Sequence, residues 1–423
     1  MKILLIAKHP RTGGAAIASS RLLEALRKEG VDAKMLVQEG ADEASGIHST
    51  THGTFKRWLN FLRFVVERLV FLPRERSRNI RFLFSLANTG EGISQNNLVR
   101  EADILHLHWI NAGFLSLDSL KELLSSGKPV VWTFHDMWPF TGGCHYALEC
   151  TEYMRSCGQC PYLKKPGAVD LSHRIWKRKE PLFRQWKLTV ITPSQWLNQC
   201  VRSSSLLQHS QIHTISNPVD DSVFRPAGRE EACASLGLDP GKKYILFGAA
   251  TVKNVMKGYP YFMEAIGNIS GKVDKDQVEI ILFGKTRGGE GESLPLNTRN
   301  IAFVHSVDTL VQLYSVAHLF VIPSLQDNLP NTIIESMFCG TPVVGFRTGG
   351  IPEMIEHKAN GYLADYKSSA DLAEGMHWIL SSGSYDKLSR ETREIALNRF
   401  SQKEAVKAHI KLYKSMVDKS SLT

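Results

Sequence analysis

Strand-length apolar runs alternate with helix-length amphipathic segments along nearly all of the 423 residues. The first run covers residues 2–7, a helical pattern follows over 15–29, and a second run covers 33–37. This alternation predicts parallel β-sheets covered by crossover helices, and hence an α/β fold class. Further strands are expected at 103–107, 129–134, 188–192, 244–249, 278–283, 301–304, 318–322 and 342–346.

The alternation pauses once, at residues 217–228, where two prolines and no apolar period are typical of a linker. We therefore expect one Rossmann-like domain over 1–216 and a second over 229–400. A long amphipathic helix within 401–423 is expected to pack back toward the first domain. Two such domains would face each other across a cleft, with ligands at the carboxyl ends of the strands.

Composition excludes several classes of protein. Hydrophobic residues make up 43% and charged residues 22%, which is ordinary for a soluble globular protein, and no apolar run reaches the ~20 residues of a membrane span. The start, MKILLIAKHP, is typical of a first strand rather than a signal peptide, so a cytoplasmic location is expected. The net charge of +9 favours an acidic partner, but nucleic acid is not expected because no binding signature for it is present.

Loops after expected strands carry groups suited to phosphates or sugars. Gly13 and Gly14 open the first helix, where a ligand could approach the backbone, although a plain tight turn is the alternative. Lys253 and Lys257 follow the first strand of the second half, where an ammonium can neutralise a diphosphate, although most lysines are only solvated. His135 follows a buried strand, and either an acid/base role or a structural one fits it.

The segment 324–346, SLQDNLPNTIIESMFCGTPVVGF, completes a series of motifs with a family resemblance. Asp327 and Glu335 stand eight positions apart, followed by TGGIPEMI, and they are preceded by the lysine loop, NPVDDSVFRP and TFHD. In series these resemble the retaining, nucleotide-sugar-dependent glycosyltransferases of family 4, which have the GT-B fold. The segment TGGCHY…CGQCPYL looks like a subgroup from bacterial capsule, exopolysaccharide and O-antigen clusters.

The resemblance implies a role for each matching residue. Glu335 would hold the ribose hydroxyls of the donor, and Asp327 would contact the transferred sugar. Lys257 would bind the diphosphate, with Lys253 as the nearest substitute for an arginine that this chain lacks. His135 would lie near the reacting sugar. The remaining donor-binding residues would be Gly13, Gly14, Asn328, Leu329, Asn331 and Thr332.

Two positions depart from the family pattern. Asp327 replaces the first glutamate and is one methylene shorter, and Pro330 stands where glycine is usual, so an N–H donor is lost. Contacts around 328–332 are therefore less firmly predicted than that of Glu335.

The resemblance implies transfer of a hexose-type sugar from a UDP- or GDP-sugar to a hydroxyl of a glycan or lipid-linked saccharide. The catalytic residues would be His135, Lys257 and Asp327. No convincing Asp-x-Asp motif is present, so lysines and helix N-termini rather than a metal cofactor would neutralise the diphosphate. Two alternatives stay open, a GT-B nucleotide-sugar epimerase and a non-catalytic, membrane-associated nucleotide-binding scaffold.

Four of the seven cysteines crowd into an expected insertion at 140–165. They are separated by five, six and two residues, and such a density in a cytosolic protein favours a structural zinc site. Disulfides and reduced thiols are the alternatives. The predicted ligands are Cys144, Cys150, Cys157 and Cys160.

The segment 55–82 carries eight basic and two acidic residues around a very apolar helical pattern. A polar stripe of Lys56, Asn60, Arg63 and Glu67 separates the apolar positions. A helix packed into the core explains the apolar residues. Docking at the inner face of a membrane explains the basic residues as well, because anionic headgroups attract them.

Overall fold

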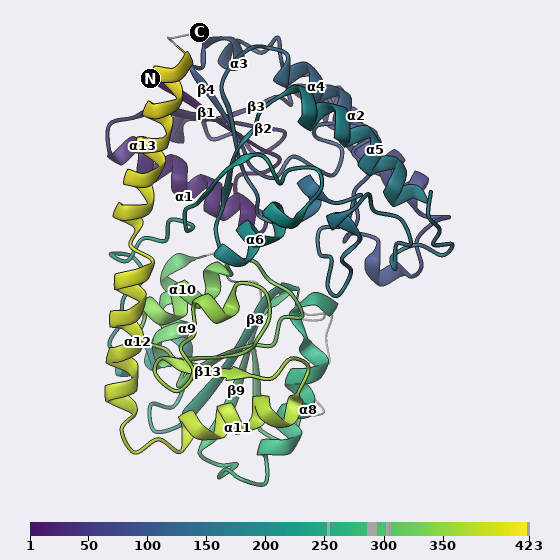
Figure 1. Cartoon of the computed structure of the whole chain (residues 1–423). Coiled ribbons are helices and arrows are strands. Elements are labelled where there is room, and N and C mark those ends of the chain that lie inside the picture. Colours follow the sequence, from purple (N-terminus) through teal and green to yellow (C-terminus); the bar gives the residue numbers. More distant parts are fainter. Residues whose placement is uncertain (252–253, 286–293, 302–303, 305, 421–423) are drawn as a thin grey trace. The chain divides into compact units, whose positions relative to one another are not determined.

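The computed structural model describes residues 1–251, 254–285, 294–301, 304 and 306–420 (Figure 1). The chain forms two compact units. Unit 1 comprises Met1–Pro218 with Lys403–Thr423, and unit 2 comprises Val219–Gln402. Each unit is built on one parallel sheet flanked by helices, so the predicted α/β class with two Rossmann-like domains is confirmed.

Unit 1 contains a seven-stranded sheet in the order β3-β2-β1-β4-β5-β6-β7. Its strands are β1 Lys2–Ala7, β2 Asp32–Val37, β3 Ile47–Ser49, β4 Ile104–Leu107, β5 Val130–Thr133, β6 Thr189–Thr192 and β7 Gln211–Thr214. Its helices are α1 Gly14–Lys28, α2 Gly53–Phe71, α3 Asn97–Glu101, α4 Leu117–Leu124, α5 Leu171–Gln185, α6 Gln195–Ser203 and α13 Gln402–Ser420.

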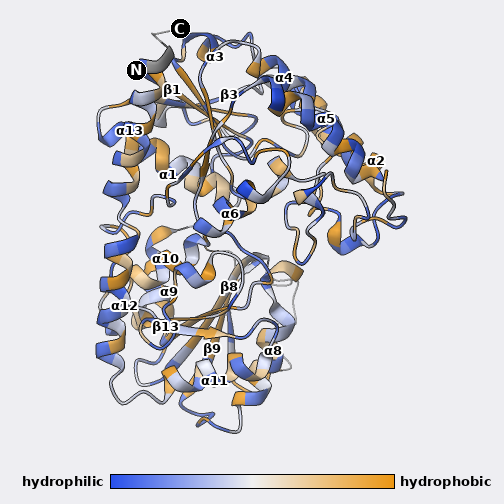
Figure 2. Cartoon of the chain, in the orientation of Figure 1, coloured by the Kyte–Doolittle hydropathy of each residue, from blue (hydrophilic) through white to orange (hydrophobic). Residues whose placement is uncertain are grey.

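Both faces of this sheet are buried, which explains why its central strands are mainly apolar. Alternate residues of β1 enter two different cores because successive side chains of a strand point to opposite faces. Leu5 packs with residues of α1 and with Tyr413 of α13, whereas Ile6 packs with Leu120 of α4 and Val201 of α6. Figure 2 shows these central strands coloured as hydrophobic.

Unit 2 contains a six-stranded sheet in the order β10-β9-β8-β11-β12-β13. Its strands are β8 Lys243–Thr251, β9 Val278–Lys285, β10 Thr298–Ile301, β11 Leu319–Ile322, β12 Val343–Phe346 and β13 Gly361–Ala364. Its helices are α7 Arg229–Leu236, α8 Tyr259–Ile269, α9 Val307–Val316, α10 Asn331–Phe338, α11 Ser369–Leu380 and α12 Tyr385–Arg399. As in unit 1, apolar cores fill both sides of the sheet.

Most predicted strands are present, and one is displaced. The strand expected at 301–304 lies at Thr298–Ile301 instead, and residues 302 and 303 are outside the described residues. Strands β3, β7 and β13 were not expected, because short or half-polar segments such as QIHT lack a clear period. Within the described ranges, no helix is both long and apolar enough to cross a membrane.

Candidate active site

Three loops of unit 2 meet at the carboxyl ends of the neighbouring strands β8, β11 and β12. The backbone N–H of Leu325 donates to Met256 O at 2.9 Å, and the N–H of Gly350 donates to Asp327 O at 3.0 Å. The Thr348 hydroxyl donates to Leu325 O at 3.1 Å. The three loops therefore form one connected backbone surface at the edge where ligands bind in open parallel sheets.

Two glycines permit this close approach. Gly258 has φ +68°, and a Cβ there would lie 1.8 Å from the carbonyl oxygen of Pro323. Gly349 has φ +59°, and a Cβ there would lie 2.0 Å from the carbonyl oxygen of Asp327. A side chain at either position would clash with backbone as well as strain the left-handed conformation. The glycines of the KG and TGG motifs are thus required by the loop junction itself.

The junction brings Lys257 and Asp327 together. The Lys257 ammonium lies 2.5 Å from Asp327 Oδ2, and the Ser324 hydroxyl donates to the same oxygen at 3.4 Å. Asp327 Oδ1 accepts from the backbone N–H of Asn328 at 3.1 Å. The lysine side chain is 31% exposed and the aspartate 15%, so the pair is partly open to a ligand. Lys253 lies outside the described residues.

Helix α10 places the second predicted carboxylate. Glu335 is buried one turn into this helix, and its Oε2 accepts from the Tyr314 hydroxyl of α9 at 3.1 Å. Pro330 occupies the N-cap position with φ −64°, which the proline ring favours. Asn331 and Thr332 form the first turn, preceded by the buried residues Asn328 and Leu329. Sequence patterns gave no indication of Tyr314, because it lies on a separate helix.

In unit 1, the corresponding edge of the sheet begins with the loop after β1. Gly13 has φ +94° and is the N-cap of α1, and Gly14 is the first residue of the helix. A Cβ at either position would meet nothing within 4 Å. The backbone conformation therefore requires glycine at Gly13, and the binding of a phosphate at these two residues stays a prediction.

His135, in the loop after strand β5, pairs with a histidine that the sequence interpretation did not single out. Its Nε2 lies 3.0 Å from His108 Nδ1, and the two rings stack at 5.3 Å. Burial lowers the pKa of His135 to about 4, so its imidazole is neutral at physiological pH. The signal for His108 was the alternation HLHW at the end of β4, which places polar rings at a strand terminus.

The two histidines line a small cavity of about 10 Å³ within unit 1, together with Thr133, Asn217 and His409. The buried His108 Nε2 has no hydrogen-bond partner within the described structure. A cavity of this size holds roughly one water molecule. A polar group of a ligand, or a water, would satisfy this nitrogen.

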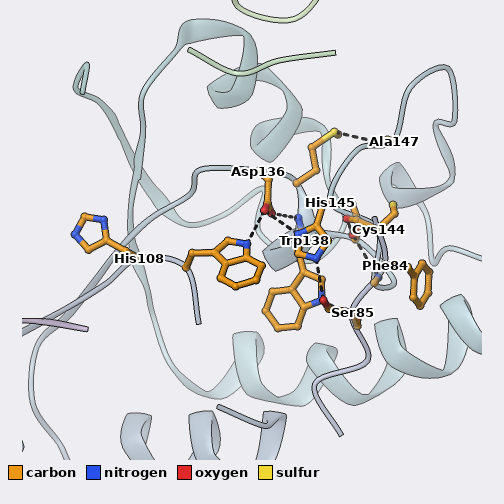
Figure 3. Close-up of polar contacts among 12 residues, drawn as sticks. Phe84, Ser85, His108, Asp136, Trp138, Cys144, His145 and Ala147 are labelled. Carbon is orange, nitrogen blue, oxygen red and sulfur yellow. Dashed lines mark hydrogen bonds and ion pairs between the residues drawn. The ribbon is translucent and has the colours of Figure 1, made fainter. Parts of the chain in front are cut away.

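Asp136 anchors the TFHD loop through a buried network (Figure 3). Asp136 Oδ2 accepts from Trp109 Nε1 at 3.0 Å and from His145 Nδ1 at 2.7 Å, and Oδ1 accepts from the Trp138 N–H at 2.9 Å. Burial alone would raise the pKa of Asp136, but His145 and these hydrogen bonds hold it below its usual value.

The same network includes a hydrogen-bonded Ser–His–Asp arrangement, because His145 Nε2 lies 2.9 Å from Ser85 Oγ. Ser85 is only 2% exposed, and neither cavity described for this chain is lined by it. A nucleophilic serine needs access to substrate. These hydrogen bonds therefore stabilise the loop that carries His135 and Asp136, and Ser85 is not positioned as a nucleophile.

The four clustered cysteines all line one cavity of about 20 Å³ in unit 1. All four are free thiols in the structure. Burial, reinforced by the neighbouring cysteines, raises the pKa of Cys144, Cys157 and Cys160 to about 12. In the described part of the chain, no group of three or more His, Cys, Asp or Glu side chains is arranged as metal ligands. The thiols would have to turn toward a common point to bind zinc.

Acidification is expected to destabilise unit 1. Burial lowers the pKa of His135 and His409 to about 4 from the ordinary value of 6.5, and lowers the pKa of His106 and His108 as well. Below pH 6.5 the unfolded chain therefore binds more protons than the folded protein, so the free energy of unfolding falls as pH falls toward 4. For His409 the loss is on the order of 3 kcal/mol.

Thermal unfolding as a function of pH measures this effect, with His409→Gln as the informative variant. His409 is buried on α13, so its replacement is expected to flatten the decline in melting temperature between neutral pH and pH 4. The matched control is His52→Gln, which alters an exposed histidine and is expected to leave the slope unchanged. An unchanged slope for His409→Gln contradicts the prediction.

Sequence comparisons agree with the fold. The model of the Glycosyltransferase Family 4 matches residues 12–223, and that of Glycosyl transferases group 1 matches residues 242–382. The chain is 22% identical over 387 residues to a D-inositol 3-phosphate glycosyltransferase of Pseudarthrobacter chlorophenolicus, covering 86% of this chain and 80% of the relative. It is 25% identical over 273 residues to the putative colanic acid biosynthesis glycosyl transferase WcaC of Escherichia coli, covering 60% and 62%.

A solved structure is also similar. The structure of Anabaena HepE in complex with UDP and glucose superimposes with a TM-score of 0.65 at 16% identity, covering 98% of this chain and 100% of that one. This likeness shows the fold, and the family match over 12–223 spans half of the chain. The protein is therefore a glycosyltransferase of family 4 with the GT-B fold.

Proposed function

We propose that the protein transfers a sugar from a UDP-sugar to a hydroxyl of a glycan or lipid-linked saccharide, with retention at the anomeric carbon. The observation that carries this proposal is the partly open Lys257–Asp327 pair at the carboxyl ends of β8 and β11. Glu335, buried one turn into the following helix, is a second carboxylate close along the chain to this pair. UDP is favoured over GDP because HepE, which has a similar fold, binds UDP.

In this reaction the bond between the anomeric carbon and the diphosphate oxygen breaks while the acceptor oxygen bonds to the same carbon. The acceptor proton passes to the departing phosphate oxygen on the same face, which retains the configuration. The ammonium of Lys257 and the N–H groups at the start of α10 would stabilise the charge that develops on the diphosphate. No metal takes part in the chemical step of this proposal, so transfer is expected to need no added divalent cation.

The other residues would bind the two ends of the donor. The Glu335 carboxylate accepts hydrogen bonds from the ribose hydroxyls, and Asp327 both positions Lys257 and contacts the transferred sugar. His135 is neutral because burial lowers its pKa, so it offers a hydrogen bond rather than a charge to the reacting sugar. Gly13 and Gly14 leave room for a phosphate at the start of α1.

We place the acceptor in cell-surface polysaccharide biosynthesis. Support comes from the relative WcaC, whose name refers to colanic acid, and from the TGGCHY…CGQCPYL segment that this chain carries. The acceptor would then be a growing saccharide on a lipid carrier. The inner face of the membrane is where such a carrier and a cytoplasmic sugar nucleotide would meet.

The decisive experiment incubates the protein with UDP- and GDP-sugars, with and without a bacterial lipid extract, and follows nucleotide release and product structure. Release of UDP that depends on the extract, with a product of unchanged anomeric configuration, supports the proposal. Release of a free sugar or its epimer without an acceptor identifies an epimerase. Tight nucleotide binding with no turnover identifies a scaffold, and an inverted product overturns retention.

For the cysteine cluster we propose one structural zinc per chain, supported by four thiols that line a single small cavity. The proposal requires them to reorient around the metal, with thiolates replacing thiols. Elemental analysis of protein purified without added metal is expected to give about one zinc per chain. A zinc content near zero contradicts the proposal. Titration of the thiols in denaturant would then show whether the cysteines are reduced or form disulfides.

A further inference from the structure

Helix α2 exposes its large aromatic side chains and buries several polar ones, the reverse of an ordinary surface helix. The residues it buries are mainly polar, namely Asn60, Glu67, Arg68 and Phe71. A surface helix of a globular protein normally turns its apolar stripe inward and its charges outward. The interpretation of this segment as a helix packed into the core holds for Phe71 and Val70, which pack in an apolar cluster, but not for the exposed aromatic residues of the helix.

Polar contacts fix this orientation. Glu67 Oε1 accepts from the backbone N–H of Leu86 at 2.9 Å and from the Arg68 guanidinium at 2.7 Å. At the other end of the helix, the Lys56 ammonium lies 2.9 Å from Oε2 of the buried Glu91. Rotating the helix to bury its apolar face would break these contacts, so the buried Glu91 would lose its ammonium partner and the N–H of Leu86 its carboxylate acceptor, which is costly. The inversion is thus a stable property of the fold.

The outward face of α2 is a continuous apolar stripe. The residues of the stripe, which are named below, are three, four, seven and three positions apart, and these spacings place them on one face of a helix. Within the described residues, every exposed large aromatic side chain lies on this helix or just after it, at Phe82. The stripe, with its exposed fractions, is Phe55 73%, Trp58 57%, Leu62 37%, Leu69 58% and Leu72 41%, with Phe61 at 63% beside it.

The surroundings of the stripe are strongly basic. Arg57, Arg74, Arg76 and Arg78 are all exposed. Both acidic residues of the segment, Glu67 and Glu75, are buried. Arg68 and Arg81 pair with these two carboxylates, so the charged residues that the segment exposes are all positive.

We propose that α2 is a docking surface for an anionic lipid bilayer. Aromatic and aliphatic side chains would enter the headgroup boundary, while the arginines contact lipid phosphates. Figure 2 shows hydrophobic and hydrophilic residues side by side along α2, as expected for a helix lying in an interface. A second copy of the chain is disfavoured as the occupant, because it would bring two sets of arginines together. The proposal is independent of the proposed function.

The test is co-sedimentation of the full chain with vesicles, in the absence of any sugar nucleotide. We expect binding to vesicles of equal parts phosphatidylglycerol and phosphatidylcholine, and roughly tenfold weaker binding to pure phosphatidylcholine or in high salt. Trp58→Ser with Phe61→Ser should remove the apolar part of the binding, and Arg76→Glu with Arg78→Glu should remove the electrostatic part. Each pair is expected to weaken binding about tenfold or more.

Matched controls replace equally exposed residues elsewhere. Val169→Ser removes an exposed apolar side chain, and Arg100→Glu reverses an exposed charge on α3. Both are expected to bind vesicles like the wild type, and melting temperatures confirm that all variants fold. Equal binding to neutral and anionic vesicles, or unchanged binding of the Trp58/Phe61 variant, overturns the proposal. A concentration-dependent dimer that this variant abolishes, without vesicle binding, also overturns it and assigns the stripe to a second copy.

Discussion

Replacing Lys257 by alanine is expected to lower the turnover of sugar transfer about 10²–10³-fold at saturating donor, in a protein that folds normally. Breaking the anomeric bond adds negative charge to the diphosphate, so a fixed ammonium stabilises the transition state more than the bound donor. The structure strengthens this expectation. Without the ammonium, the Asp327 carboxylate, whose side chain is only 15% exposed, would face the diphosphate with its charge uncompensated.

Two further variants make the test specific. Lys272→Ala removes another lysine that pairs with a carboxylate, Glu374, and is expected to retain wild-type turnover because both partners are exposed. Lys257→Ala combined with Asp327→Asn relieves the repulsion and is expected to be less impaired in donor binding than Lys257→Ala alone. If Lys257→Ala turns over at the wild-type rate, its assignment to the diphosphate is wrong.

If Glu335 holds the donor ribose as proposed, Glu335→Gln is expected to weaken the affinity for UDP-sugar by ~1.5–3 kcal/mol, because the ribose hydroxyls would lose a charged acceptor while the side chain keeps nearly the same shape. This corresponds to about a tenfold to hundredfold increase in the dissociation constant, measured by calorimetry. Turnover at saturating donor should change less than for Lys257→Ala, since the ribose contact is made before and during the reaction.

A structural role for Glu335 predicts a different outcome, which Tyr314→Phe reveals. This variant removes the hydroxyl that donates to Glu335 but leaves the carboxylate in place. If Glu335 binds the donor, Tyr314→Phe keeps most of the affinity while Glu335→Gln loses it. Equal affinities for wild type and Glu335→Gln would remove this residue from the donor site.

The fold could be predicted where burial makes the sequence pattern simple. Strand β1 matches the predicted 2–7 because nearly every side chain in it is buried, which produces a continuous apolar run. Strand β7 was missed because it lies at the edge of the sheet, where the residues QIHT are exposed or only partly buried. The helical period of α2 and its polar stripe were also readable. Which face of α2 is turned toward the protein could not be predicted, because it depends on partners distant in the sequence, such as Glu91 and Leu86.

The candidate site, too, could be predicted only in part from the sequence. Lys257, Asp327 and Glu335 could be proposed from the sequence because each lies in a local motif beside a strand end or helix start, and their roles stay predictions. Their partners were missed where contact depends on the order of strands or helices in space. Tyr314 reaches Glu335 from another helix, and His108 reaches His135 only because β4 and β5 are neighbours in the sheet.

Unit 1 is built from two segments that are separated in the chain by unit 2, and this constrains the order in which the two units can fold. Residues 403–420 are translated after all of unit 2, yet Tyr413 supplies the hydroxyl that lies 2.7 Å from the buried His106 Nδ1 and packs against Leu5. Domains usually fold as units in the order of their translation. Here one face of the unit 1 sheet stays incompletely covered until residues 403–420 have been translated, because α13 contributes to the core on that face. The later, uninterrupted stretch Val219–Gln402 is the first that can complete its own core.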